Sequence, residues 1–174
     1  GRFTSGTGNP AERDAGMIRI IGVGRVKERA LQQSIQEYLR RLQPYQKTEI
    51  VEVEDLPAPQ DNSPAQNDLV RQREGEKILA RLKPDDYVIL LDLKGKMLSS
   101  PELAQKLQDV FTYRGSAIAF VIGGSLGVSP AVIERADFRW QLSELTFPHQ
   151  LVRLMLTEQL YRSFRILNHE PYHK

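Results

Sequence analysis

The chain has 174 residues, of which 40% are apolar and 26% charged, which is the composition of one globular domain rather than of a disordered polyelectrolyte. Cysteine is absent, which excludes disulfides, thiolate metal sites and cysteine nucleophiles and is typical of a reducing, cytoplasmic setting. The formal charge of +2 is too small to indicate nucleic-acid binding by itself. We expect no membrane span, because every apolar run is far shorter than the roughly 20 residues that a spanning helix needs.

The first residues differ from the remainder. Residues 1–16 are rich in Gly, Ser, Thr and Asn and have no apolar period, so we expect an expression-derived remnant or a disordered leader. A single domain is then expected over residues 17–174.

From Met17 onward, strand-like and helix-like segments alternate. Apolar, β-rich runs predict strands over residues 18–23, 87–93 and 117–122, alternation predicts one over 48–53, and residues 138–142 are a candidate for the last strand. Apolar residues three and four apart predict helices over residues 28–42, 64–82, 101–113, 130–136 and 148–167. The alternation predicts an α/β domain with a mostly parallel sheet flanked by helices.

Gly22-Val23-Gly24 follows the first predicted strand and resembles the opening of a dinucleotide-binding loop. The third glycine of such a loop is missing. No acidic residue stands convincingly at the end of the second strand, although Glu52, Glu54 and Asp55 come near. A tight turn is therefore the favoured interpretation, and a nicotinamide-dependent enzyme is a rival hypothesis.

Two later loops are stronger candidates for a binding site. Ile122–Gly127, IGGSLG, follows a buried strand, where open α/β sheets place their ligands. Its glycines let a ligand approach the backbone or serve a tight turn, and spacing alone leaves both interpretations open. Leu142–His149, LSELTFPH, joins a strand to a helix that a proline opens; it offers several backbone amides and carbonyls, or only caps the helix.

The C-terminal segment carries aromatic and basic groups. His169 and His173 have the spacing of two metal ligands on a helix, but Pro171 breaks a helix between them, so we expect no metal site. Tyr172 can stack on a base and Lys174 can contact phosphate, as a nucleotide-binding lid requires. A frayed chain end is the alternative.

Four motifs in this order resemble one family: 121–127 VIGGSLG, 142–153 LSELTFPHQLVR, 158–162 EQLYR and 171–174 PYHK. The family is that of the bacterial ribosomal RNA large-subunit methyltransferase H, within the SPOUT superfamily, and the likeness runs over residues 17–174. It implies a C-terminal trefoil knot, a rare exception to unknotted chains, and a homodimer. It also implies methyl transfer from S-adenosylmethionine to N3 of a pseudouridine in helix 69 of 23S rRNA, on assembled ribosomes.

The resemblance also assigns site residues. Carried over by motif, the cofactor contacts are Leu91, Gly123, Leu142, Ser143, Glu144, Leu145, Thr146 and Phe147. Tyr172 and His173 are expected to close over the target base, with His173 taking the N3 proton or fixing the base edge. His149 is the alternative base, or holds the cofactor loop. The cations expected to bind RNA phosphates are Arg153, Arg162, Arg165 and Lys174, with the dimer interface as an alternative for Arg153.

One further hypothesis competes with this enzyme. The chain could be a noncatalytic ribosome-associated factor that keeps the cofactor pocket as a relic. The intact glycine loop, cofactor loop and Tyr-His-Lys terminus favour the enzyme.

Overall fold

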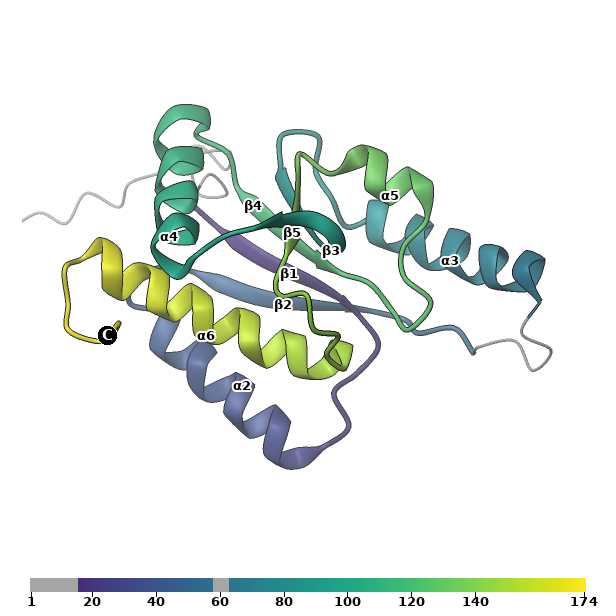
Figure 1. Ribbon diagram of the computed structural model, residues 1–174, viewed down its shortest axis with the longest axis horizontal. Helices are drawn as coiled ribbons and strands as arrows, with labels where there is room; N and C mark the ends of the chain where they lie inside the picture. Colours follow the sequence, from purple (N-terminus) through teal and green to yellow (C-terminus); the bar gives the residue numbers. More distant parts are fainter. Residues whose placement is uncertain (1–15, 58–62) are drawn as a thin grey trace, which may run out of the picture.

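A five-stranded sheet lies at the centre of the computed structural model, which describes residues 16–57 and 63–174. Its order is β2-β1-β4-β3-β5, and every neighbouring pair is parallel (Figure 1). The strands are β1 (Ile18–Val23), β2 (Thr48–Val53), β3 (Tyr87–Met97), β4 (Ile118–Ile122) and β5 (Phe138–Gln141). The helices are α2 (Arg29–Leu42), α3 (Pro64–Leu79), α4 (Ser100–Asp109) with the π-helical turn η1 (Val110–Arg114), α5 (Pro130–Arg135) and α6 (His149–Leu167).

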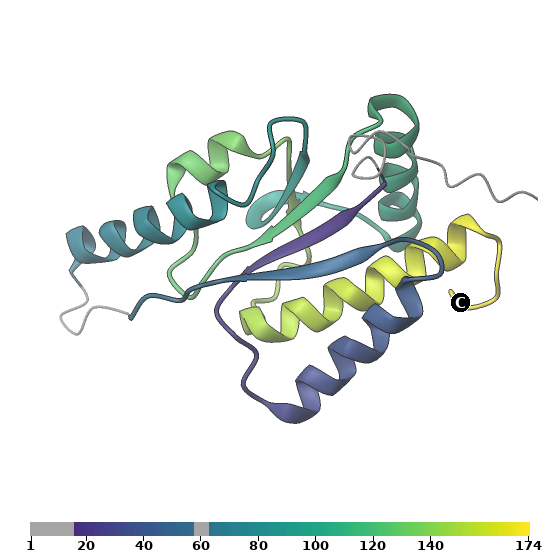
Figure 2. The ribbon, with the colours of Figure 1, turned by 180° about the vertical axis from the view of Figure 1, so that it is seen from behind.

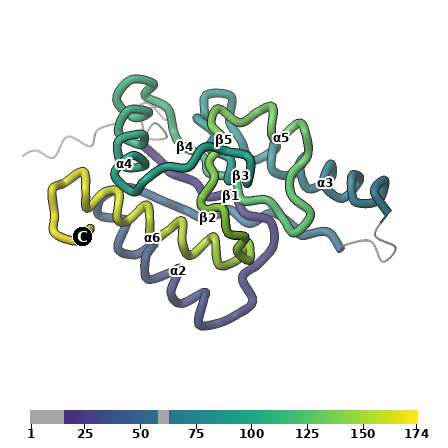
Figure 3. The backbone as a smooth tube through the Cα atoms, viewed as in Figure 1, coloured from purple at the N-terminus to yellow at the C-terminus, as the bar shows by residue number. Residues whose placement is uncertain are grey.

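Helices cover both faces of the sheet, which confirms the predicted α/β fold. Helices α2, α4 and α6 pack on one face, and α3 and α5 on the other (Figures 1 and 2). The central strands β1 and β4 are buried along their whole length, because a parallel strand between two helical layers meets no solvent. Helix α6 lies alongside α2, as the tube in Figure 3 shows.

Three segments differ from their predicted forms. Strand β3 extends to Met97 through an irregularity between Leu91 and Lys96, beyond the predicted end of its apolar run. Helix α3 ends at Leu79, three residues before the predicted end, and Leu69, which fits the apolar period of this helix, is 40% exposed. The predicted helix over residues 101–113 divides into α4 and η1 before Gly115, whose φ of 60° ends it.

The predicted leader lies outside the described residues, apart from Gly16. The trefoil knot stays a prediction of the resemblance. Within the described ranges, no helix combines the length and the apolar character that crossing a bilayer requires.

Candidate functional site

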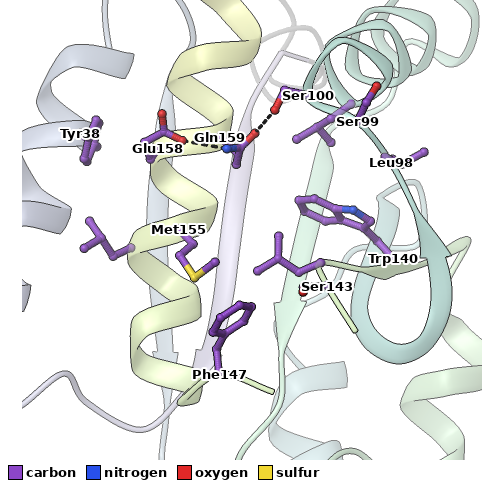
Figure 4. A pocket seen from close by; sticks show the side chains of 13 residues that line it. Tyr38, Leu98, Ser99, Ser100, Trp140, Ser143, Phe147, Met155, Glu158 and Gln159 are labelled. Carbon is purple, nitrogen blue, oxygen red and sulfur yellow. Dashed lines mark hydrogen bonds between the residues drawn. The ribbon is translucent and has the colours of Figure 1, made fainter. Parts of the chain in front are cut away.

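A pocket of about 420 Å³ lies between α6, the beginning of α4 and the loop that joins β5 to α6 (Figure 4). Its walls combine apolar and polar side chains in similar numbers, so they can bind a ligand that has both characters. The apolar side chains are Leu98, Leu103, Trp140, Leu142, Phe147, Leu154 and Met155, and the polar ones are Tyr38, Ser99, Ser100, Ser143, Glu158 and Gln159.

Hydrogen bonds connect the polar groups of this pocket. Ser100 Oγ donates to Gln159 Oε1 at 2.7 Å, and Gln159 Nε2 donates to Glu158 Oε2 at 2.9 Å (Figure 4). At the start of α4, the Ser99 hydroxyl accepts from the Glu102 amide and the Glu102 carboxylate accepts from the Ser99 amide. This capping box fixes the beginning of α4 at the pocket.

After α6 the chain reverses direction. His169 adopts a φ of 56°, in the left-handed region that few residues other than glycine occupy. The Glu170 amide donates to the Arg165 carbonyl at 2.9 Å and the His169 amide to the Ile166 carbonyl at 3.0 Å, which is the Schellman pattern of a helix end. The terminal segment therefore folds back along α6.

The terminal segment is attached to α6 through Tyr172. The Tyr172 hydroxyl donates to Glu158 Oε1 at 3.0 Å, and its ring meets that of Tyr161 edge-on at 5.0 Å. Burial, followed by the hydrogen bond to Glu158, raises the pKa of Tyr172 well above its usual value, so the phenol keeps its proton. Glu158 thus faces the pocket with one oxygen and the terminal segment with the other.

Arg162 joins the same cluster. Its guanidinium donates to Glu158 Oε1 at 2.6 Å and lies 3.0 Å from His173 Nδ1, and it stacks over the Tyr172 ring at 4.9 Å. The two residues predicted to be catalytic, Tyr172 and His173, are therefore held side by side on α6.

The structure brings together three of the predicted cofactor residues: Leu142, Ser143 and Phe147 line the pocket. Leu91 and Gly123 do not line it, although Leu91 and Leu142 pack against the same hydrophobic core.

The rest of the β5–α6 loop faces outward. Glu144, Leu145 and Thr146 are exposed, and the side chain of Leu145, a predicted cofactor contact, is the most exposed of the apolar ones here at 68%. The loop therefore contributes its two ends, not its middle, to the pocket in this structure.

The glycine loop makes a tight turn. The Gly127 amide donates to the Gly124 carbonyl at 3.0 Å, and Gly127 has a φ of 84° that favours glycine. A Cβ at Gly123 would lie 2.6 Å from Val128 Cγ1. The turn interpretation is therefore confirmed, and contact between this loop and a cofactor stays a prediction.

Arg153 is a correction to the predicted RNA-binding set. Its side chain is only 2% exposed, donates to Glu52 at 3.0 Å and to the Gly24 carbonyl at 3.2 Å, and so binds the end of β1 rather than solvent. A Cβ at Gly22 would lie 2.5 Å from Arg153 Nη2. The Gly22–Gly24 segment accommodates this guanidinium, which removes the basis for a dinucleotide loop there.

The other predicted RNA-binding cations have different surroundings. Arg162 is paired with Glu158 and Arg165 with Glu170, the latter pair at 2.9 Å, so both charges are partly neutralised. Lys174 is exposed.

The histidines are dispersed. His149 begins α6, His169 lies at its end and His173 contacts Arg162. In the part of the chain that the structure describes, no three His, Cys, Asp or Glu side chains cluster as a metal site would require.

Sequence reasoning missed several pocket residues, notably Trp140, Leu98, Glu158 and Gln159. Glu158 and Gln159 were visible only as part of a family motif. Ser99, another pocket residue, did have a signal in the sequence: the Ser99-x-x-Glu102 spacing is typical of a capping box and predicts that a helix begins there.

The comparisons with known proteins agree with this architecture. A family model described as "Predicted SPOUT methyltransferase" matches residues 17–173. Proteins named ribosomal RNA large subunit methyltransferase H from Carboxydothermus hydrogenoformans and Alkaliphilus oremlandii are 51% and 53% identical to this chain. Each match covers 90% of this chain and 99% of the relative. The chain therefore belongs to the SPOUT methyltransferases and, within them, to the family of ribosomal RNA large subunit methyltransferase H.

A solved structure shows the same fold at much lower identity. The probable methyltransferase from Bordetella pertussis Tohama I aligns with a TM-score of 0.52 and 14% identity, over 88% of this chain and 98% of that one. This likeness supports the predicted fold class, and the family match confirms the prediction of a methyltransferase.

Proposed function

We propose that this enzyme transfers a methyl group from S-adenosylmethionine to N3 of a pseudouridine in helix 69 of 23S rRNA, on assembled ribosomes. Family membership supports the class of reaction and an RNA substrate. The observation that carries the proposal is Glu158, whose carboxylate faces both the pocket beside the Leu142–Phe147 loop and the Tyr172–His173 segment. The pocket proposed for the cofactor and the segment proposed to close over the target base therefore meet at Glu158.

The pocket fits the cofactor in size and chemistry. Its volume of about 420 Å³ lies within the roughly 300–1,000 Å³ of small-molecule sites. Trp140, Leu142 and Phe147 offer apolar walls for an adenine, and Ser143 and Gln159 offer polar groups. When bound, the cofactor supplies a methyl group already activated on a sulfonium, so the side chains bind and orient the reactants while the N3 proton of the base passes to water.

Further cofactor contacts are proposed from the resemblance alone. They are Leu91, Gly123, Glu144, Leu145 and Thr146. His149, at the first position of α6, is proposed to hold the adjoining loop.

The surroundings of His173 favour a positioning role over a general base. A guanidinium can only donate hydrogen bonds, so Arg162 Nη1 assigns the acceptor role to His173 Nδ1 at 3.0 Å. A neutral imidazole then carries its proton on Nε2. His173 therefore presents a donor that can bind a carbonyl oxygen of the target base and orient N3.

The partners are proposed from the same resemblance: a homodimer in the cytoplasm acting on ribosomes. The nearly balanced charge, with Arg162 and Arg165 ion-paired, supports recognition of a folded assembly over nonspecific RNA binding. Binding to ribosomes should thus be tighter than binding to isolated helix 69 RNA, and equal affinities would contradict this part of the proposal.

The test combines methyl transfer with cofactor binding. Labelled S-adenosylmethionine is incubated with ribosomes lacking helix 69 methylation, using the wild type and His173→Ala. Trp140 is the single tryptophan and lines the pocket, so its fluorescence reports cofactor binding separately. We expect label on pseudouridine N3 with the wild type, and a large loss of transfer with retained binding in the variant.

Other outcomes contradict the proposal at different points. Cofactor binding without transfer to any RNA would favour the noncatalytic factor. Methyl transfer to another nucleotide would contradict the proposed substrate and leave the proposed cofactor and reaction unchanged. A fluorescence response to a nicotinamide cofactor and none to S-adenosylmethionine would overturn the cofactor assignment.

A further inference from the structure

One face of α3 supports the glycine loop after β4. Arg71 Nη1 donates to the Leu126 carbonyl at 3.2 Å. One turn later, Glu74 Oε1 lies 3.1 Å from where a Cβ of Gly124 would stand. A Cβ at Gly75 would lie 2.4 Å from Ser129 Oγ, just after the loop. Positions three and four apart share a helix face, so Arg71, Glu74 and Gly75 all lie on the face of α3 that is turned toward this loop.

Glu74 is the buried member of this face. Its residue exposure is 4%, and Oε2 accepts from the Leu56 amide at 3.1 Å. The carboxyl of Asp55, which follows β2, is its acidic neighbour. Glu74 thus connects the chain after β2 with the loop after β4, at the edge of the sheet where the cofactor is proposed to bind.

We infer that Glu74 is a positioning residue for the cofactor: its buried carboxyl, held by the Leu56 amide, lies against the Gly123–Val128 loop and keeps it in place without touching the cofactor. The inference rests on the proposed function, because that loop is a proposed cofactor contact. The proposed methyl transfer itself assigns no part to Glu74.

The surroundings of Glu74 favour its protonated form. Two neighbouring carboxyl groups, one of them buried, are more stable when one keeps its proton. Burial is the main cause that raises the pKa of Glu74 above its ordinary 4.5, with Asp55 acting in the same direction and the Leu56 amide opposing. Lys77 is the other charged group that acts on the Glu74 carboxyl, and it is paired with Glu54 at 2.6 Å. The loop itself has no ionisable side chain over residues 123–128.

Raising the pH should weaken the support that Glu74 gives to the loop. The native pKa of Glu74 is raised, so its stabilising contribution is present at low pH and is lost as pH rises through that pKa. Deprotonation places two carboxylates next to each other behind Gly124. Cofactor affinity should therefore fall as pH rises from the ordinary carboxyl range.

The test uses Glu74→Gln, Glu74→Leu and the control Glu76→Gln, an exposed neighbour with the same change of charge. An amide accepts from Leu56 and donates to Asp55 at every pH, whereas leucine does neither. Affinity for S-adenosylmethionine is measured through Trp140 fluorescence from acidic to alkaline pH. Wild type and Glu76→Gln should lose roughly fivefold in affinity over the titration, Glu74→Gln should stay flat, and Glu74→Leu should be weaker by about tenfold throughout.

Hydrogen exchange of the loop amides provides a readout that needs no cofactor. Corrected for intrinsic rates, exchange over residues 123–128 should accelerate with pH in the wild type and not in Glu74→Gln. Equal pH profiles for the wild type and Glu74→Gln in exchange and in affinity would overturn the inference, even if Glu74→Leu fails to fold. A wild type that binds no S-adenosylmethionine contradicts the proposed function instead, and exchange then decides the role of Glu74.

Discussion

Tyr172 and Glu158, 14 positions apart in the chain, are joined by a hydrogen bond of 3.0 Å from the phenol to Glu158 Oε1. The second oxygen of the same carboxylate accepts from Gln159, and through it connects to Ser100 at the start of α4. One side chain on α6 therefore determines both the position of the C-terminal segment and the polar side of the pocket. Removing a hydrogen bond to the Glu158 carboxylate should therefore lower the rate of methyl transfer more than it lowers the free energy of unfolding.

Tyr172→Phe should lower the rate of methyl transfer by about tenfold, since a hydrogen bond to a charged group contributes about 1.5 kcal/mol. Binding of S-adenosylmethionine should change by less than about twofold, because the phenol does not line the pocket. Single-turnover methylation and Trp140 fluorescence measure the two quantities. Tyr113→Phe, at a tyrosine that is 81% exposed, is the matched control. Unchanged turnover in Tyr172→Phe would show that the segment is positioned by other contacts.

Much of the sheet could be predicted because burial on both faces leaves a continuous apolar run. The bounds of β1, which is buried throughout, agree with prediction at both ends. Those of the edge strand β2 agree as well, although β2 is only partly buried and was predicted from its alternation. The extension of β3 carries polar residues and pairs with β5 through backbone contacts, which leave no apolar pattern. Leu69 fits the helical period, but it belongs to the first half of α3. That half extends beyond the strands (Figure 1), so the sheet does not cover the Leu69 side chain, which stays 40% exposed.

The site was predictable only where loops carry unusual residues. Leu142 and Phe147, which the family motif assigned and which flank such a loop, line the pocket, whereas Trp140 and Gln159 reach it through tertiary packing. Arg153 was misassigned by residue type. Its spacing from Thr157 and Leu160, both fully buried, already placed it on the inward face of α6.

Gly22→Ala should destabilise the fold by about 2 kcal/mol, because the added methyl would lie 2.5 Å from the guanidinium of buried Arg153. In an Arg153→Leu background, the same change should cost less than about 0.5 kcal/mol. Urea denaturation of the four proteins gives the coupling free energy. Gly16→Ala, where nothing lies within 4 Å, controls for the glycine substitution itself. Equal costs in both backgrounds would mean that the two residues are not in contact.

Ser99→Ala should lower the free energy of unfolding by about 1 kcal/mol through loss of the N-cap of α4. Ser125→Ala, at an exposed loop serine, should have no such effect.

The carboxylate of Glu102, the second residue of this capping box, makes the stability of the cap depend on pH. Hydrogen bonds from Ser99 lower the pKa of Glu102 below 4.5, so its contribution is present above that value and is lost as pH falls through the lowered pKa. The stability difference between the wild type and Glu102→Gln, measured by denaturation, should therefore shrink on acidification. A difference that grows instead would contradict the capping box.

His169 tests the reversal that returns the chain to the pocket side of α6. Its φ of 56° costs a residue with a Cβ about 1 kcal/mol, and more for a β-branched one. His169→Gly removes that cost but loosens the unfolded chain, so stability should stay within about 0.5 kcal/mol of the wild type. His169→Val should destabilise by roughly 1–2 kcal/mol. At Gln108, an exposed position within α4, the order should reverse, because glycine is the poorer helix former there. If valine were tolerated better than glycine at both positions in chemical denaturation, residue 169 would not occupy the left-handed conformation in solution.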